Sequence, residues 1–170
     1  SLPQAVAQLV PDTTAHAQAA VVEAYKQNYR ATRQSGLLHE PLYDGMEDLL
    51  RRLHDDGWLL AVATGKSDRG LAACLGAHGI ADLFVSLQTA DRHPSKPHPA
   101  MLDTALGDAL AEAGHAVMIG DTTYDMAMAR AAGVRAIGVA WGYHEAEELI
   151  AAGAEPVAQT MDELERLIRG

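Results

Sequence analysis

The sequence has one cysteine, Cys74, and no long run of apolar residues. A lone thiol excludes an intrachain disulfide and a zinc site built on cysteines, and it favours a reducing compartment, so we expect a cytoplasmic protein. The apolar run at residues 58–63 is far too short to span a bilayer, and residues 1–4 lack the basic start and apolar stretch of a signal peptide. We therefore expect no membrane partner.

Positive charge is also scarce. The chain carries 13 Lys and Arg against 23 Asp and Glu, a net charge of −10. Such a field repels polyanions, so we expect no nucleic-acid partner, although a local positive pocket can still hold a small anion. The 170 residues, 48% of them hydrophobic, suffice for one folded domain with a small appendage and argue against disorder.

The order of the predicted elements indicates an α/β protein. Residues 3–36 read as helical with a break at 11–14, and a connector then runs to Pro41. Beyond it, short apolar strands alternate with helices, which predicts a doubly wound parallel sheet. No Gly-x-Gly-x-x-Gly turn follows any strand, so a dinucleotide-binding domain of the dehydrogenase type is excluded. The expected strands are 58–63, 83–87, 116–120, 134–139 and 155–158. The expected helices are one from 46 that stops at 55–57, and 67–78, 97–113, 122–132, 145–152 and 160–168.

In such sheets the working residues follow the carboxyl ends of the strands. The first of these ends carries Thr64, Gly65 and Ser67. A hydroxyl, a glycine amide and a helix N-terminus together suit a phosphate or another oxyanion. A plain turn with Thr64 or Ser67 as the helix cap explains the same residues, and on this motif alone it is favoured.

The second strand end leads to Lys96, directly before Pro97. Proline suits the first turn of a helix, and a lysine there opposes the helix dipole, so an anion held nearby would explain its position. An ordinary surface lysine is the alternative. We expect His93 and His98, in the same loop, to face the solvent.

The third strand end carries two carboxylates, Asp121 and Asp125, four residues apart and expected on one face of a first helical turn. Hard oxygen ligands so placed suit Mg²⁺. Alternatively, Asp121 or Thr122 caps the helix while Asp125 favours its dipole. The coincidence of Thr64, Lys96 and a carboxylate pair at three strand ends weighs against the plain alternatives.

Three segments, 64–66, 95–97 and 120–126 with 131–133, resemble the second, third and fourth signature motifs of the haloacid dehalogenase superfamily. Within it, the chain is similar to the phosphoglycolate phosphatase-like branch, which carries a helical cap. The resemblance implies a partial helical cap at 1–40 and a Rossmannoid α/β core at 41–170.

The resemblance also implies roles for the residues of the strand ends. Thr64 and the amide of Gly65 would bind the phosphoryl group, and Lys96 would neutralise its charge. Asp121 would ligate Mg²⁺, and Asp125 would be the second carboxylate, as a ligand or as the holder of a metal-bound water. The implied activity is Mg²⁺-dependent hydrolysis of a small phosphorylated metabolite through an aspartyl-phosphate, with Thr64, Lys96 and Asp125 as catalytic residues. The alternative is a non-catalytic module of the same fold that binds phosphate or a partner.

One family motif is absent, because no Asp-x-Asp occurs in the sequence. In the family this motif ends the first strand of the core and supplies the nucleophile, so we expect a truncated and inactive form. That strand would lie between the strands at 58–63 and 116–120, and its loss would leave two unpaired edges. We expect rearranged pairing or another chain to close the gap, through a homodimer or strand exchange.

Overall fold

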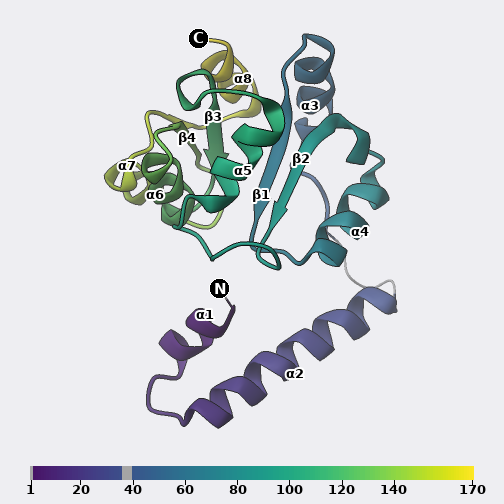
Figure 1. The fold of residues 1–170 in the computed structure, drawn as a ribbon, viewed down its shortest axis with the longest axis vertical. Coiled ribbons are helices and arrows are strands. Elements are labelled where there is room, and N and C mark those ends of the chain that lie inside the picture. The colour runs from purple at the N-terminus through teal and green to yellow at the C-terminus, as the bar shows by residue number, and fades with distance from the viewer. Residues whose placement is uncertain (1, 36–39) are drawn as a thin grey trace. The chain divides into compact units, whose positions relative to one another are not determined.

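The computed structural model describes residues 2–35 and 40–170 and divides the chain into two compact units, Ser1–Pro41 and Leu42–Gly170 (Figure 1). The first unit contains α1 (Leu2–Leu9) and α2 (Ala15–Gln34). The break predicted at 11–14 is confirmed, and the hydroxyl of Thr14 accepts a hydrogen bond from the amide of Ala17 at 3.2 Å. The predicted end of the second helix, residue 36, lies outside the described residues. No helix within the described ranges is long and apolar enough to cross a membrane.

The second unit alternates strands and helices as the sequence predicts. Its strands are β1 (Leu60–Thr64), β2 (Phe84–Thr89), β3 (Val117–Gly120), β4 (Arg135–Val139) and β5 (Val157–Ala158). Its α-helices are α3 (Met46–Asp55), α4 (Asp68–His78), α5 (Ala100–Ala109), α6 (Thr123–Ala131), α7 (Ala146–Ala152) and α8 (Met161–Arg169). Short 3₁₀ turns occupy Ala81–Leu83 and Ala113–His115. The predicted α/β class is confirmed.

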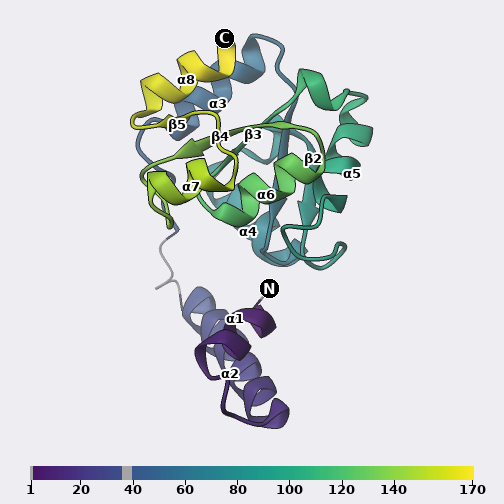
Figure 2. The same cartoon turned by 90° about the vertical axis from the view of Figure 1, so that its left-hand side faces the viewer.

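The strands pair in parallel, but in two separate sheets, β1-β2 and β3-β4-β5. Helices α6 and α7 lie on one side of the three-stranded sheet, and α3 and α8 lie on the other (Figure 2). Each face is therefore buried in its own apolar cluster, one around Met126 and Leu149 and the other around Leu49 and Ile137. Burial on both faces explains why the strands read as continuous apolar runs.

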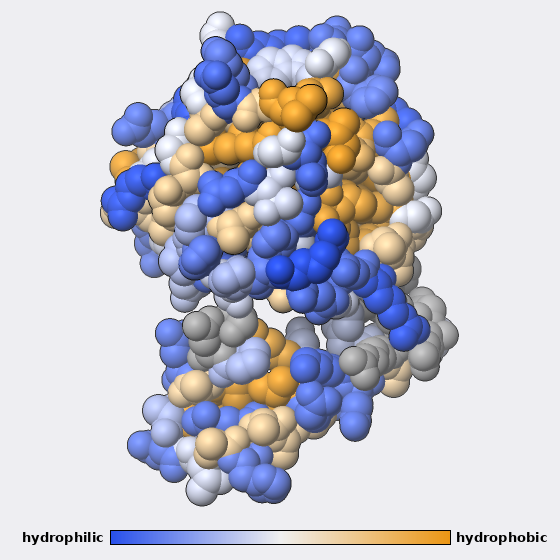
Figure 3. All heavy atoms as spheres, viewed as in Figure 1, coloured by the Kyte–Doolittle hydropathy of each residue, from blue (hydrophilic) through white to orange (hydrophobic). Residues whose placement is uncertain are grey.

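An apolar slot separates β1 from β3. No strand pairing joins these two strands in the described ranges, and a cavity of about 640 Å³ lies between Leu60–Ala63 and Val117–Ile119. Apolar side chains of α5 line it, as do those of α3 and α8. Figure 3 shows apolar side chains gathered over β2 and beyond the upper end of α5 on this face of the second unit. The expectation that rearranged pairing within the chain closes the gap is wrong, because both edges stay open.

Helix α5 is shorter than predicted. It ends at Ala109 because Leu110, 95% exposed, turns left-handed at φ 52° and its amide bonds back to Gly107. It begins only at Ala100, with Pro99 at the N-cap. Pro97 thus lies outside the helix, and the prediction that it opens the first turn is wrong.

Strand β1 also begins later than predicted. The amide of Trp58 donates to the carbonyl of Leu53 at 2.9 Å, so Trp58 still belongs to the turn that ends α3. Gly57 makes that turn possible with a φ of 87°, a conformation that only glycine adopts without strain.

Candidate functional site

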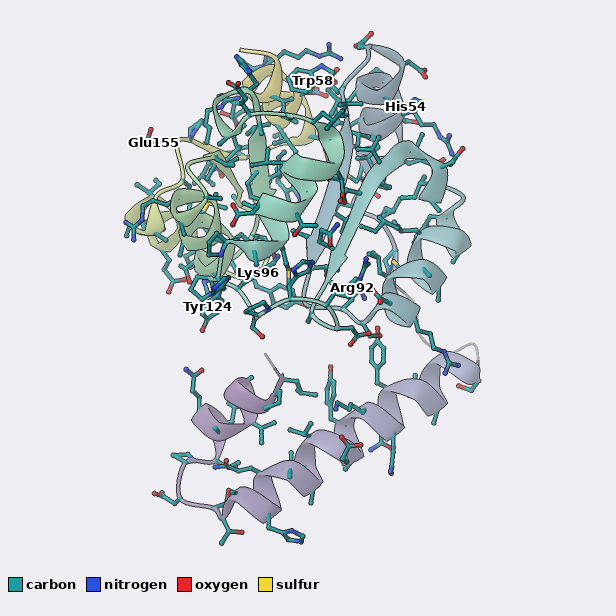
Figure 4. The ribbon with its side chains drawn as sticks, in the orientation of Figure 1. His54, Trp58, Arg92, Lys96, Tyr124 and Glu155 are labelled. Atoms are coloured by element: carbon teal, nitrogen blue, oxygen red, sulfur yellow. The ribbon has the colours of Figure 1, made fainter. Side chains whose placement is uncertain are left out.

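The residues predicted to act together lie at the carboxyl ends of β1, β2 and β3. Thr64 ends β1 and pairs in register with Thr89, which ends β2. Gly120 ends β3 on the other side of the slot. Parallel strands place these ends at one edge of the fold, where Lys96, Arg92 and Tyr124 lie in Figure 4.

The loop after β1 is shaped by local hydrogen bonds. The amide of Lys66 donates to the Thr64 hydroxyl at 3.1 Å, and the amide of Gly70 donates to the Ser67 hydroxyl at 3.1 Å. Ser67 is therefore the N-cap of α4, as the plain reading of this motif has it. A Cβ added to Gly65 would meet no atom within 4 Å, so the backbone there is open to the approach of a ligand. No hydrogen bond between described residues joins Thr64 to Lys96, Asp121 or Asp125.

Lys96 is not an ordinary surface lysine. Its Nζ lies 2.5 Å from Oδ1 of Asp125, and the two side chains are only 19% and 6% exposed. Lys96 belongs to the loop between β2 and α5, whereas Asp125 belongs to the first turn of α6, so the pair joins the two sheets across the end of the slot. The dipole argument for Lys96 fails, since the residue precedes the first turn of α5, but its association with a buried carboxylate is real.

Asp125 also takes part in the capping of α6. Its Oδ2 accepts hydrogen bonds from the amide and the hydroxyl of Thr122, at 3.1 and 2.8 Å. The Thr122 hydroxyl in turn accepts from the amide of Asp125. The capping alternative for Thr122 and Asp125 is therefore realised, and both oxygens of Asp125 are engaged.

Asp121 occupies the tip of β3 in a different setting. Its Oδ2 accepts from the amide of Tyr143 at 3.1 Å, and its carbonyl accepts from the amide of His144. A Cβ on Gly142 would lie 2.1 Å from the Cβ of Asp121, so the β4–α7 loop can pass this close only with glycine. A Cβ on Gly120 would likewise lie 2.4 Å from the Cβ of Asp125, so the first turn of α6 can approach β3 this closely only with glycine there.

The negative charge of Asp121 affects the pKa of Tyr43. Burial first, and then the negative charge of Asp121, raise the pKa of Tyr43 above its ordinary value. Tyr43 also makes an edge contact with Trp141, at 6.4 Å between ring centroids. Sequence reasoning did not connect Tyr43 with Asp121, because 78 positions separate them and no local pattern links them.

The sequence did not predict a cluster of hydrogen-bonded polar side chains, Asp68, Thr89 and Arg92, at the end of β2. The Thr89 hydroxyl donates to Asp68 at 2.6 Å, and Arg92 pairs with the same carboxylate at 2.9 Å. These contacts, Thr89 first, lower the pKa of Asp68. The amide of Asp68, at the first turn of α4, is taken by the carboxylate of Asp91. Two loops are thus tied together beside Thr64.

The residues present fit a magnesium ion in part. Asp121 offers a carboxylate oxygen, Oδ1, that accepts no hydrogen bond from the described part of the chain. Across residues 2–35 and 40–170, no three His, Cys, Asp or Glu side chains come together as a ready metal site. Mg²⁺ usually keeps several waters and needs only one or two protein carboxylates, so Asp121 suits it as a single anchoring ligand.

Comparison with known proteins identifies the family of the chain. The sequence pattern of the family described as haloacid dehalogenase-like hydrolase matches residues 2–139. The protein named "Probable phosphatase IndB" from Dickeya dadantii is 37% identical over 148 residues, which are 85% of this chain and 64% of that protein. A phosphoglycolate phosphatase from Vibrio parahaemolyticus is 32% identical over 77% of this chain and 58% of its own length. The chain therefore spans only about three fifths of these relatives.

Solved structures give the same result. The crystal structure of a predicted phosphatase from Clostridium acetobutylicum superposes with a TM-score of 0.85 at 28% identity, over 99% of this chain and 76% of that one. The match to the family pattern covers most of the chain, and the fold agrees with it. The chain belongs to the haloacid dehalogenase-like hydrolase family, and it is similar to the phosphoglycolate phosphatases within it.

Proposed function

We propose that this chain supplies the phosphate-binding half of a phosphatase that hydrolyses small phosphate monoesters. The observation that carries the proposal is the pair Lys96–Asp125, which places a half-buried ammonium at the carboxyl ends of the strands on both sides of the slot. Phosphoryl transfer needs positioning and neutralisation of charge more than any other help from a protein. In a chain of net charge −10, a lysine fixed at this point is the group that admits an anionic ester.

The other residues have roles consistent with that of Lys96. The hydroxyl of Thr64 and the open amide of Gly65 would hold phosphoryl oxygens beside the N-terminus of α4. Asp121 would hold Mg²⁺, which supplies further neutralisation of phosphate charge when bound. Asp125 would keep Lys96 in place and, through its hydrogen bonds with Thr122, fix the start of α6. The role predicted for Asp125 as a metal ligand, or as the holder of a metal-bound water, stays a prediction.

The nucleophile is not among these residues. We propose that it is an aspartate on a strand that fills the slot, paired with β1 and β3, because apolar layers flank the slot on both sides as they would flank a central strand. Its carboxylate would take the phosphoryl group as an aspartyl-phosphate and release it to water. Without an Asp-x-Asp sequence, we expect this chain to bind phosphate without hydrolysing its esters. A cytoplasmic location, expected from the lone Cys74, also stays a prediction.

The binding half of the proposal can be tested on the chain itself by calorimetry with inorganic phosphate in the presence of Mg²⁺. We expect a dissociation constant on the order of millimolar, and a loss of about tenfold or more in Lys96→Ala, since a hydrogen bond to a charged group contributes about 1.5–3 kcal/mol. Lys26→Ala is the matched control, because Lys26 pairs with Glu23 on the exposed surface of α2. Equal binding by both variants would contradict the proposed role of Lys96.

A non-catalytic module that binds phosphate or a partner is the alternative, and the absence of Asp-x-Asp is the observation that favours it. The two functions differ in the complete protein. A phosphatase gains hydrolysis when the strand with the nucleophile is present, whereas a binding module does not.

A further inference from the structure

Strand β2 buries polar side chains where apolar ones would be expected. Ser86 and Gln88, two residues apart and therefore on one face of the strand, are 4% and 3% exposed. The Gln88 amide donates to the Ser86 hydroxyl at 2.7 Å and to Oδ2 of Asp108, on α5, at 2.9 Å. The Ser86 hydroxyl donates to the same oxygen at 2.7 Å. Burying such groups is costly unless every one is satisfied, so their arrangement is a specific feature of this strand.

The network ends on the loop that carries Lys96. The remaining polar atom of Gln88, Oε1, lies 2.7 Å from Nε2 of His93. Because the amide nitrogen of Gln88 is already committed to Ser86 and Asp108, Oε1 is the acceptor and the His93 ring donates from Nε2. The expectation that His93 faces the solvent is wrong: its ring is half-buried and bonded to a core strand.

The residue before His93 is held from the opposite face of β2. The guanidinium of Arg92 donates to Asp68 at 3.0 Å and to the carbonyl of Leu87. Asp68 is itself bonded to the buried hydroxyl of Thr89. Consecutive loop residues are thus fixed to two different faces of one strand.

Lys96 follows His93 by three residues, which span at most about 10 Å of extended chain. Its Nζ must nevertheless meet Asp125, which lies in the first turn of α6 after a strand of the other sheet, at 2.5 Å. No strand pairing between described residues links the two sheets, so the path of this loop decides whether the lysine reaches its partner.

We propose that His93 is a positioning residue for Lys96, acting through its bond to a network in which the buried side chains of Ser86 and Gln88 are held by the exposed Asp108. The network fixes the start of the loop and so directs the ammonium to Asp125 and to the phosphate site. This inference rests on the proposed function only for the role of Lys96 toward phosphate; the positioning itself concerns this chain alone.

Competitive acylation of the lysines tests the positioning. The chain's amino groups are Lys26, Lys66, Lys96 and the N-terminus, so trace labelling with an amine-acylating reagent at one fixed pH, read by peptide mass spectrometry, gives each rate separately. In the unaltered chain we expect Lys96 to react about tenfold more slowly than Lys26, because it is 19% exposed against 45% and is paired with a buried carboxylate. In His93→Ala the ratio of the Lys96 rate to the Lys26 rate should rise about fivefold.

Two further variants separate positioning from a general loss of structure. His93→Gln keeps an N–H donor and should return the ratio to within about twofold of the unaltered chain. His54→Ala removes an exposed side chain of α3 at the opposite end of the unit (Figure 4) and should leave the ratio unchanged. The inference is overturned if His93→Ala leaves the ratio as it was, or if His93→Gln raises it as much as His93→Ala does. Protection of Lys96 by added phosphate is scored separately, so a failure of the proposed function is distinguishable from a failure of the positioning.

Discussion

Nζ of Lys96 lies 2.5 Å from Oδ1 of Asp125, and this ion pair joins two sheets that share no strand pairing in the described part of the chain. One partner comes from the loop after β2 and the other from the first turn of α6. The pair therefore fixes the geometry of the strand ends on both sides of the slot, where the phosphate site is proposed.

Removing the lysine should destabilise the chain. Lys96→Met leaves the carboxylate of Asp125, 6% exposed, without its cation, and such a loss costs about 3 kcal/mol in the free energy of unfolding. The double variant with Asp125→Asn should recover at least half of this, because no buried charge is then left unpaired. Denaturant unfolding measures all three. Lys26→Met, which breaks an exposed pair, should change stability by about 0.5 kcal/mol or less; an equal effect at both lysines would contradict the buried pairing.

The glycines beside the two carboxylates should not tolerate a side chain. A Cβ at position 142 would lie 2.1 Å from the Cβ of Asp121, and one at 120 would lie 2.4 Å from that of Asp125. Gly142→Ala and Gly120→Ala should therefore each cost about 1–3 kcal/mol of stability as the carboxylates are displaced. Gly107→Ala, in α5 with nothing near its added Cβ, should instead gain about 0.5–1 kcal/mol. Thermal unfolding of the three variants compares their stabilities. A Gly142→Ala variant as stable as the unaltered chain would contradict the close approach of Gly142 to Asp121.

The titration of Tyr43 should report the charge of Asp121. Because burial and Asp121 raise its pKa above the ordinary 10.0, the unfolded chain loses this proton first, and the free energy of unfolding falls as the pH rises above that value. In Asp121→Asn the pKa of Tyr43 should decrease but stay above ordinary, since burial remains. Carbon NMR of tyrosine labelled at Cζ follows the titration, with Asp103→Asn, at an exposed position of α5, as the control. An unchanged Tyr43 in Asp121→Asn would contradict the proximity of the two groups.

The open edges of β1 and β3 should drive self-association, as the expectation of a homodimer or strand exchange has it. Unpaired apolar edges recruit other strands, so the sedimentation coefficient should rise with protein concentration. Ala61→Lys places a charge in the slot and should abolish the rise. Ala73→Lys adds the same charge on the exposed side of α4 and should leave it intact. If Ala61→Lys leaves the self-association unchanged, the chains do not associate through the slot, which would contradict the prediction.

The strands and most helix bounds were predictable from the sequence because they depend on local signals. The run at residues 136–139 is apolar since both faces of β4 are buried, and Gly79 marks the end of α4 with a φ of 64°. The early end of α5 was not predictable, because Leu110 adopts a left-handed conformation that carries no glycine signal.

The sequence predicts the candidate residues at each strand end separately, but not the contacts between residues of different strand ends. The types and order of Thr64, Lys96 and Asp121 indicate phosphate and metal chemistry, yet the contact between Lys96 and Asp125 depends on a loop path that no periodicity encodes. His93 was misjudged for the same reason, since its partner Gln88 is buried by tertiary packing alone.

Hydrolysis of phosphate monoesters by the complete protein, with the strand that would fill the slot present, tests the central claim most directly. We expect Mg²⁺-dependent turnover that falls by at least about a hundredfold in Lys96→Ala, with Lys26→Ala unchanged. Turnover that persists in Lys96→Ala, or a complete protein carrying an Asp-x-Asp strand that hydrolyses no phosphate ester in Mg²⁺, would contradict the account.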